Sequence, residues 1–295
     1  MIRIVFIFAF LSSAWNVSTF ALTSLSFLTR RTHPTSRLAH VTQSSEVQHA
    51  GLPLILQNLY CGDSLLGYRR TENGLHNVTV ERISEIPPVY VMRNLVTPTE
   101  CHAIQSAVST MSPAQTVSGD REEEIRKHSH VAWLRNEDVD GLVGRLAEAV
   151  RSMMISSPDI GVEDMQVVRY SEGGEYALHH DGNDRILTVI YYLNGQGETW
   201  FPLADGESRP EDTQQDALKR AEGLKPGMDG ILVSTSRSTQ SKAYVPLNLG
   251  DAVAFYSYLR DGRMDWSAIH AGLPACEEKF IANHFFRPIP RSNQE

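Results

Sequence analysis

Apolar residues recur along the chain at two different spacings, which predict two kinds of element. Between residues 139 and 153 they recur every three or four positions, the period of a helix with one buried face. Thr97-Pro98-Thr99-Glu100 is a capping box with proline at the first helical position. A helix is therefore expected from there to about Met111 as well.

Downstream, short apolar and aromatic runs are bounded by glycine, proline and polar residues, a pattern typical of strands. We expect strands at Gln166–Tyr170, Tyr176–His180, Leu187–Leu193, Gly250–Phe255, Ala268–Ala271 and Lys279–Phe286. Together these strands indicate a double-stranded β-helix, a jelly-roll whose open mouth can hold a site. The predicted fold class is α+β, a double-stranded β-helix core with flanking N-terminal helices.

The chain divides into three expected parts. Residues 1–45 form a targeting leader, residues 46–85 a β-rich N-terminal extension of unknown role, and residues 86–295 the main domain. Within the main domain, residues 203–245 are long for a connection and are expected to be an insertion with a short helix at Asp212–Glu222. This insertion is either a lid over the barrel mouth or a segment without fixed structure.

The leader has a mixed composition. Arg3 precedes the apolar run Ile4–Trp15, and the first acidic residue is Glu46. A charged start before an apolar core is typical of a secretory signal, while the Ser, Thr and Arg content of residues 22–45 also fits a transit or bipartite leader. We expect the secretory pathway and the endoplasmic reticulum, with a plastid or mitochondrion as the alternative.

The net charge bears on possible binding partners, and the cysteine count bears on possible disulfides. The formal net charge of the 295 residues is −8, and the main domain has no dense Lys/Arg run, which disfavours nucleic acid as a partner. Cys61, Cys101 and Cys276 allow at most one internal disulfide. The sequence leaves open whether Cys61 and Cys101 pair, and whether the chain works with a partner subunit or as a homodimer.

Two imidazoles and a carboxylate are the candidate metal ligands. On an extended strand His179 and Asp181 point to the same side and His180 to the opposite side. His270, from a distant strand, would complete one face of an octahedron and leave three positions open. Two histidines and a carboxylate in this arrangement are typical of non-haem Fe(II) oxygenases. A short His-x-Asp motif alone is weak evidence for a metal site, so the prediction depends also on His270 and Lys279 downstream.

Five ordered blocks between about Pro87 and Arg287 resemble the prolyl 4-hydroxylase branch of the 2-oxoglutarate and Fe(II)-dependent dioxygenases. The blocks are Tyr-x-x-Gly-x-x-Tyr-x-x-His-x-Asp at 170–181, Arg185 to Asn194, Gly197 to Pro202, Gly250 to Phe255 together with Asp265 to Pro274, and Lys279 to Arg287. The resemblance implies Fe(II) and 2-oxoglutarate as cofactor and co-substrate, with ascorbate as a reductant. It also implies hydroxylation of proline in a protein or peptide, with release of succinate and CO2.

The resemblance assigns roles residue by residue. His179, Asp181 and His270 match the iron ligands, and Lys279 matches the residue that pairs with the distal carboxylate of 2-oxoglutarate. A cation at the end of an apolar slot would select a diacid, because an unpaired buried charge is costly. The co-substrate is further expected to be bound by Tyr170, Thr199 and Tyr192. The peptide substrate is expected to be contacted by Tyr176, Arg185 and Arg287.

The chain departs from the family pattern at several places near its end. Phe280 follows the lysine where tryptophan is usual, Asn283 stands where threonine is common, and Arg287 stands where histidine or another polar residue is found. These departures put peptide specificity in doubt more than iron binding. The alternatives are therefore the same chemistry on another side chain, a free amino acid or a small metabolite, and, less favoured, a non-catalytic metal-binding jelly-roll.

Overall fold

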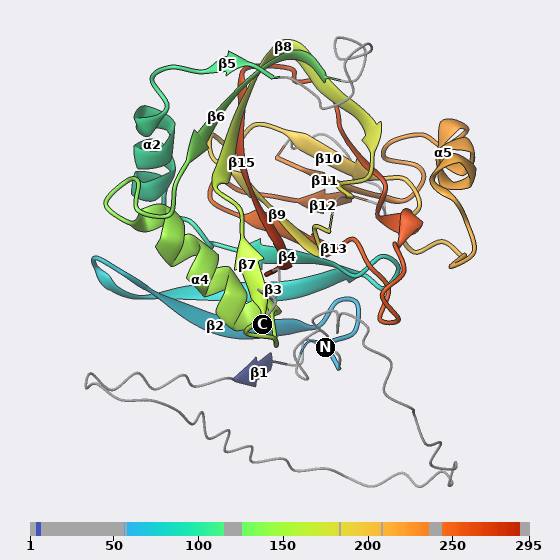
Figure 1. The fold of residues 1–295 in the computed structure, drawn as a ribbon, viewed down its shortest axis with the longest axis horizontal. Helices are drawn as coiled ribbons and strands as arrows, with labels where there is room; N and C mark the ends of the chain where they lie inside the picture. The colour runs from blue at the N-terminus through green and yellow to red at the C-terminus, as the bar shows by residue number, and fades with distance from the viewer. Residues whose placement is uncertain are drawn as a thin grey trace, which may run out of the picture. The chain divides into compact units, whose positions relative to one another are not determined.

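A computed structural model describes residues 4–6, 56, 58–114, 126–182, 184–207, 209–235 and 244–289 of the protein. Strands dominate these residues, and they are accompanied by the helices α2, α4 and α5 (Figure 1). The elements are β1 (Ile4–Phe6), β2 (Ser64–Thr71), β3 (Gly74–Ser84), β4 (Val89–Arg93), α2 (Pro98–Ala107), β5 (Ser112–Pro113), β6 (Arg126–Leu134), α4 (Leu142–Met154), β7 (Ile160–Val162), β8 (Met165–His179), β9 (Leu187–Tyr192), β10 (Glu198–Phe201), α5 (Gln214–Glu222), β11 (Ile231–Ser234), β12 (Tyr244–Pro246), β13 (Ala252–Tyr256), the 3-10 turn η1 (Trp266–Ala268), β14 (His270–Gly272) and β15 (Lys279–Pro288).

The sheet curls over on itself through strand β8. Its path runs β2-β3-β4-β13-β9-β15-β8-β14-β10-β11-β12, and β6 pairs with β8 as well. The first part of β8 pairs with β15, with Tyr170 opposite Lys279, whereas its last residues pair with β14, with His179 opposite His270. One long strand thus belongs to both layers of the barrel. The double-stranded β-helix predicted from the sequence is confirmed.

Alternation along each strand separates two cores. On β15, Ala282 and Phe286 belong to the core that also holds the buried residues of α2 and α4, such as Ile104 and Leu146. Ile281 belongs to the inner core, between the two layers of the sheet. The predicted flanking helices are therefore confirmed as a cover for the outer face of the sheet. They leave the inner face for the site.

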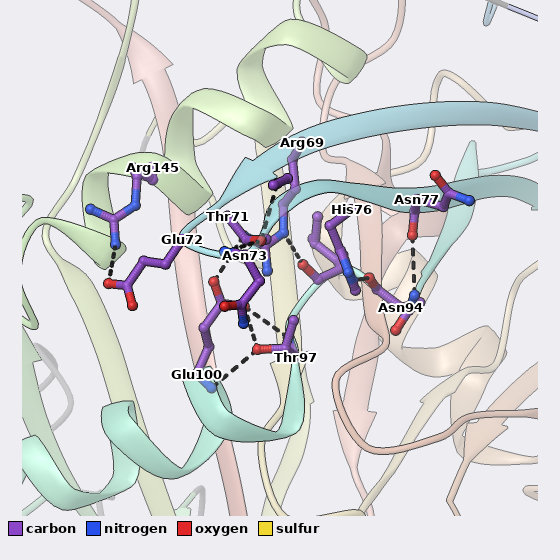
Figure 2. A network of polar contacts seen from close by, with 12 residues as sticks. Arg69, Thr71, Glu72, Asn73, His76, Asn77, Asn94, Thr97, Glu100 and Arg145 are labelled. Carbon is purple, nitrogen blue, oxygen red and sulfur yellow. Dashed lines mark hydrogen bonds and ion pairs between the residues drawn. The ribbon is translucent and has the colours of Figure 1, made fainter.

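Helix α2 begins where the capping box predicts. Thr97 caps the N–H of Glu100 with its side chain, and the Glu100 carboxylate accepts a bond from the Thr97 N–H in return. Such caps contribute about 1 kcal/mol. Figure 2 shows Arg69 of β2 reaching the same Glu100 carboxylate, with one guanidinium nitrogen 3.0 Å from its oxygen. The helix is thereby tied to the sheet at its first turn.

The predicted helix ends differ from the observed ones. α2 ends at Ala107, before the expected Met111, because the N–H of Val108 bonds to the Gln105 carbonyl and closes the last turn tightly. α4 begins after Gly141, whose φ of 74° is a left-handed conformation that glycine adopts without strain. The short helix expected at Asp212–Glu222 is α5.

The strands expected at Leu187–Leu193, Gly250–Phe255 and Lys279–Phe286 correspond to β9, β13 and β15, whereas the strand expected at Ala268–Ala271 begins only at His270, because Ala268 ends the turn η1. The strands expected at Gln166–Tyr170 and Tyr176–His180 form the single strand β8. Gly173, with φ of 73°, and Gly174 lie between the two halves, and a side chain at Gly174 would come within 2.8 Å of the Ser171 carbonyl oxygen. β6, β10 and β11 were not predicted as strands. The last of these shows that the 203–245 insertion contributes a strand to the sheet.

The domain division expected from the sequence, with a boundary at residue 85, stays a prediction. β3 is paired with β4 across this boundary. The targeting leader lies outside the described residues except for β1, which pairs with β2. In the described parts of the chain, no helix is long and apolar enough to cross a membrane. Cys61, Cys101 and Cys276 are free thiols.

Candidate metal centre

Three side chains, from two neighbouring strands and the loop after one of them, meet on the inner face of the sheet. His179 ends β8, Asp181 follows in the loop after it, and His270 begins β14 directly opposite His179. One ligand atom from each of the three lies within 4.8 Å of the other two. The predicted triad is therefore brought together. His180 turns away, and its Nε2 lies 3.1 Å from the carbonyl oxygen of Asp265, as the alternation of the strand predicted.

Neighbouring backbone groups orient both imidazoles. Nδ1 of His179 lies 2.8 Å from the Ala177 carbonyl oxygen, and Nδ1 of His270 lies 3.1 Å from that of Ala268. Since a carbonyl can only accept, each Nδ1 carries the proton and each Nε2 keeps its lone pair for a metal. Burial lowers the pKa of His270 to about 3, so this ring is neutral.

The carboxylate completes a donor set that fits Fe(II). Oδ2 of Asp181 accepts a bond of 2.5 Å from the Thr188 hydroxyl, and its Oδ1 lies 3.6 Å from Nε2 of His179. Burial favours the protonated acid, whereas the hydrogen bond from the Thr188 hydroxyl favours the carboxylate. Two neutral imidazoles and one carboxylate on one side match the facial arrangement of non-haem iron sites.

Thr188 was not among the predicted site residues, and its role can be tested. Thr188→Val removes the hydroxyl that holds Asp181 while keeping the side-chain shape, so we expect iron affinity to fall by about 10- to 100-fold. Thr188→Ser keeps the hydroxyl and should bind iron nearly as the unchanged protein does. Iron retention during titration with a chelator measures both. Equal retention by the two variants would show that Thr188 does not support Asp181.

Lys279 is buried on the same inner face, with only 2 % of its surface exposed. Its Nζ donates to the Glu198 carbonyl oxygen at 3.1 Å and lies 5.2 Å from the centre of the Tyr170 ring. Burial lowers the pKa of Lys279 to about 8, opposed by the negative charge of Glu198. No carboxylate of the described residues lies within 4 Å of Nζ. A buried ammonium without an anion beside it is a site for an anionic group.

Two of the three residues expected to bind a co-substrate line the pocket together with this ammonium. Tyr170 and Thr199 line the same pocket as the triad and Lys279, and both are buried. The hydroxyls of Tyr192 and Thr199 lie 2.7 Å apart, so Tyr192 reaches the pocket wall through Thr199. Burial raises the pKa of Tyr170 to about 12, which keeps the phenol protonated and able to donate. The pocket therefore offers hydrogen-bond donors between the metal triad and a cation.

The residues expected to contact a peptide lie in different surroundings. The Tyr176 ring stacks on the His179 imidazole, with ring centres 3.5 Å apart, and lines the pocket. Both arginines lie outside the pocket lining. Arg185 is held by the Glu163 carboxylate at 2.8 Å, and Arg287 is half exposed at 4.0 Å from the same carboxylate. A direct peptide contact by the two arginines stays a prediction.

Several residues that line the pocket were not predicted as site residues from the sequence. They are Arg126, Thr188, Ile190, Asn283 and Phe285, all of which line the pocket. Asn283 and Phe285 alternate with Lys279 along β15, so the period of a strand could have found them. Arg126, whose guanidinium lies 4.0 Å from the centre of the Tyr176 ring, could not have been found, because β6 has no alternating pattern.

Comparison with known proteins points to one superfamily. Residues 165–287 match the sequence profile described as the 2OG-Fe(II) oxygenase superfamily. Over 219 residues the chain is 28% identical to Probable prolyl 4-hydroxylase 8 of Arabidopsis thaliana, covering 69% of each chain. Over 205 residues it is 30% identical to the transmembrane prolyl 4-hydroxylase of Homo sapiens, covering 57% of this chain and 38% of that protein.

Among solved structures, a viral collagen prolyl hydroxylase from Paramecium Bursaria Chlorella virus-1, in complex with 2OG, is similar. The TM-score is 0.43 at 21% identity, and the match covers 68% of this chain and 96% of that one.

Proposed function

We propose that the chain is a member of the 2OG-Fe(II) oxygenase superfamily, whose profile matches residues 165–287, and that it hydroxylates proline residues in protein or peptide substrates. The observation that carries the proposal is that the His179, Asp181 and His270 triad shares one pocket with a buried Lys279, which has no carboxylate partner among the residues that the structure describes. The relatives named prolyl 4-hydroxylase support the choice of proline as target. Bound iron, with 2-oxoglutarate and O2, supplies the oxidation that inserts oxygen into a C–H bond and releases succinate and CO2.

The protein's own residues bind and orient. His179, Asp181 and His270 would hold Fe(II) through two Nε2 atoms and a carboxylate oxygen. Lys279 would bind the far carboxylate of 2-oxoglutarate, with the hydroxyls of Tyr170 and Thr199 donating to the same molecule. These groups fix the co-substrate at both of its ends. A four-carbon or six-carbon diacid would leave one end unpaired.

Apolar side chains between the charged ends exclude water. Ile190, Ile281 and Phe285 line the pocket and lie on neighbouring strands β9 and β15. Exclusion of water strengthens each electrostatic contact inside and protects reactive species from side reactions. Tyr176, stacked on His179, lines the pocket beside the triad. We propose that it positions the target ring.

The proposal is tested by succinate formation. The purified protein with Fe(II), 2-oxoglutarate and ascorbate is expected to form succinate faster when a proline-rich peptide is added. The peptide should gain one oxygen at proline, as mass spectrometry would detect. Ascorbate is included because we propose that it restores iron oxidised in turnovers without substrate. A peptide with each proline replaced by alanine is the matched control, and equal stimulation by both peptides would refute proline as the target.

A non-prolyl substrate is the second candidate function. It is favoured by one observation: Arg185, a predicted substrate contact, is already held by Glu163 and lies 3.6 Å over the Phe285 ring. If free amino acids stimulate succinate formation and proline peptides do not, this candidate replaces the first.

A further inference from the structure

Lys279 reaches the pocket past a single glycine, Gly197, in the turn that precedes β10. Gly197 has φ of 131°, a conformation that residues with side chains rarely adopt. A Cβ added there would lie 2.7 Å from Cε and 2.9 Å from Cδ of Lys279, which is closer than real Cβ contacts come. The lysine side chain therefore occupies the space where residue 197 lacks a side chain.

The backbone around Gly197 is held by hydrogen bonds to two successive carbonyl oxygens. The N–H and the hydroxyl of Thr235 both donate to the Gly197 carbonyl oxygen, at 3.1 and 3.2 Å. The next carbonyl, of Glu198, accepts from the Leu273 N–H at 3.2 Å and from Nζ of Lys279 at 3.1 Å. In a collision between a new methyl group and the lysine, the flexible lysine would be the part that moves.

The direction of that movement follows from what lies on either side. Gly197 lines a separate cavity of about 250 Å³, together with Glu198, Thr235, Cys276 and Glu277. Lys279 lines the metal-facing pocket and not this outer cavity. Gly197 thus stands between the outer cavity and the lysine. A methyl group on Gly197 would push the lysine towards the metal-facing pocket.

We propose that Gly197 is a positioning residue for the co-substrate: it fixes where the Lys279 ammonium stands, and so sets the length of diacid that fits between this ammonium and the metal. The inference rests on the proposed function, because it needs a diacid that binds at both ends. It assigns the choice of a five-carbon diacid to the backbone at Gly197 as well as to the lysine. Gly197 itself is not among the residues that line the metal-facing pocket.

The test is the binding of diacids to the Gly197→Ala variant, measured by calorimetry on the Mn(II)-loaded protein, which does not turn over. We expect 2-oxoglutarate to bind at least about 10-fold more weakly, a loss that a displaced charge partner produces. Oxaloacetate, one carbon shorter, should lose less affinity than 2-oxoglutarate does. In turnover assays the KM for 2-oxoglutarate should rise while the KM for peptide and the metal content stay unchanged.

Gly74→Ala is the matched control. Gly74 has φ of 109°, and a Cβ there would meet no atom within 4 Å, so the variant bears the backbone strain without touching Lys279. It should bind 2-oxoglutarate as the unchanged protein does. Thr235→Val is a second variant that adds no strain. It removes one of the two bonds to the Gly197 carbonyl, and we expect binding about two- to fivefold weaker.

The outcomes separate this inference from the proposed function. If Gly197→Ala and Gly74→Ala bind 2-oxoglutarate equally well, the inference is overturned, whatever the peptide assay shows. If the unchanged protein binds 2-oxoglutarate but no proline peptide stimulates turnover, the prolyl assignment fails and the role of Gly197 stands. Failure of the unchanged protein to bind any diacid would overturn both.

Discussion

Replacing His179 with alanine is expected to remove iron from the protein and to reduce peptide-stimulated succinate formation below about 1% of its original rate. The triad offers one atom from each of three residues, so the loss of one leaves two ligands in a site that holds iron through three. Changes to groups that merely support ligands cost 10- to 100-fold in affinity, and the loss of a ligand should cost more. Metal analysis of the purified variant, with the succinate assay, measures the effect.

His180→Ala is the control for this prediction. His180 is the next residue in the chain, but its ring bonds to the Asp265 carbonyl oxygen and accepts the Gly182 N–H at 3.1 Å, away from the metal. We expect full iron content and a loss of stability of about 1 kcal/mol from the missing hydrogen bonds. Full iron in His179→Ala, or an empty site in His180→Ala, would contradict the assignment.

Replacing Lys279 with methionine is expected to have opposite effects on function and on stability. The affinity for 2-oxoglutarate should fall by about 100-fold or more, since removing one partner of a buried charge pair costs about 2–5 kcal/mol. Without co-substrate, the variant should unfold at a higher urea concentration than the unchanged protein. Its free energy of unfolding should be larger by about 1–3 kcal/mol, because an unpaired buried ammonium is replaced by a side chain that belongs in an apolar site. Lys127→Met, at an exposed lysine paired with Glu175, is the control and should change neither property much.

The pH dependence of stability and of 2-oxoglutarate binding follows from the lowered pKa of Lys279. Burial lowers the pKa of Lys279 from 10.5 in water to about 8, so the protonated form is disfavoured by folding. The cost of the buried charge is fully present below about pH 8 and disappears as the pH rises towards 10.5. The stability gained in Lys279→Met should therefore be largest below pH 8. In the unchanged protein, 2-oxoglutarate binding should weaken above pH 8, and constant affinity up to pH 9.5 would argue against an ammonium partner.

The metal triad could be predicted from the sequence because it depends on local spacing and on one distant histidine in an ordered set of motifs. His179 and Asp181 do converge, although Asp181 lies just beyond the end of β8. Lys279 was assigned through the family resemblance, and the period of β15 places it on the inner face with Ile281 and Phe285. These are properties of single strands. A chain can encode them within a few residues.

The parts of the fold and of the site that were not predicted from the sequence depend on pairing between distant segments. β6 has the polar sequence Arg126-Lys127-His128-Ser129-His130, which lacks the alternation of a half-buried strand, and it is a strand because β8 pairs with it. The Glu163 carboxylate that holds Arg185 lies 22 residues away in the chain. No spacing rule connects two such residues. The outer cavity beside Gly197 likewise forms from three separate segments.

The pairing of β13 with β4 limits how short a fragment of this protein can fold on its own. The part that carries the superfamily match, residues 165–287, includes β13 but not its neighbour β4. Cut out alone, it would present the free backbone groups of Ala252–Phe255 along an unprotected edge, which invites self-association by strand addition. It would also uncover the face that α2 and α4 shield. The region that matches the superfamily profile is thus smaller than the region that must fold as one piece.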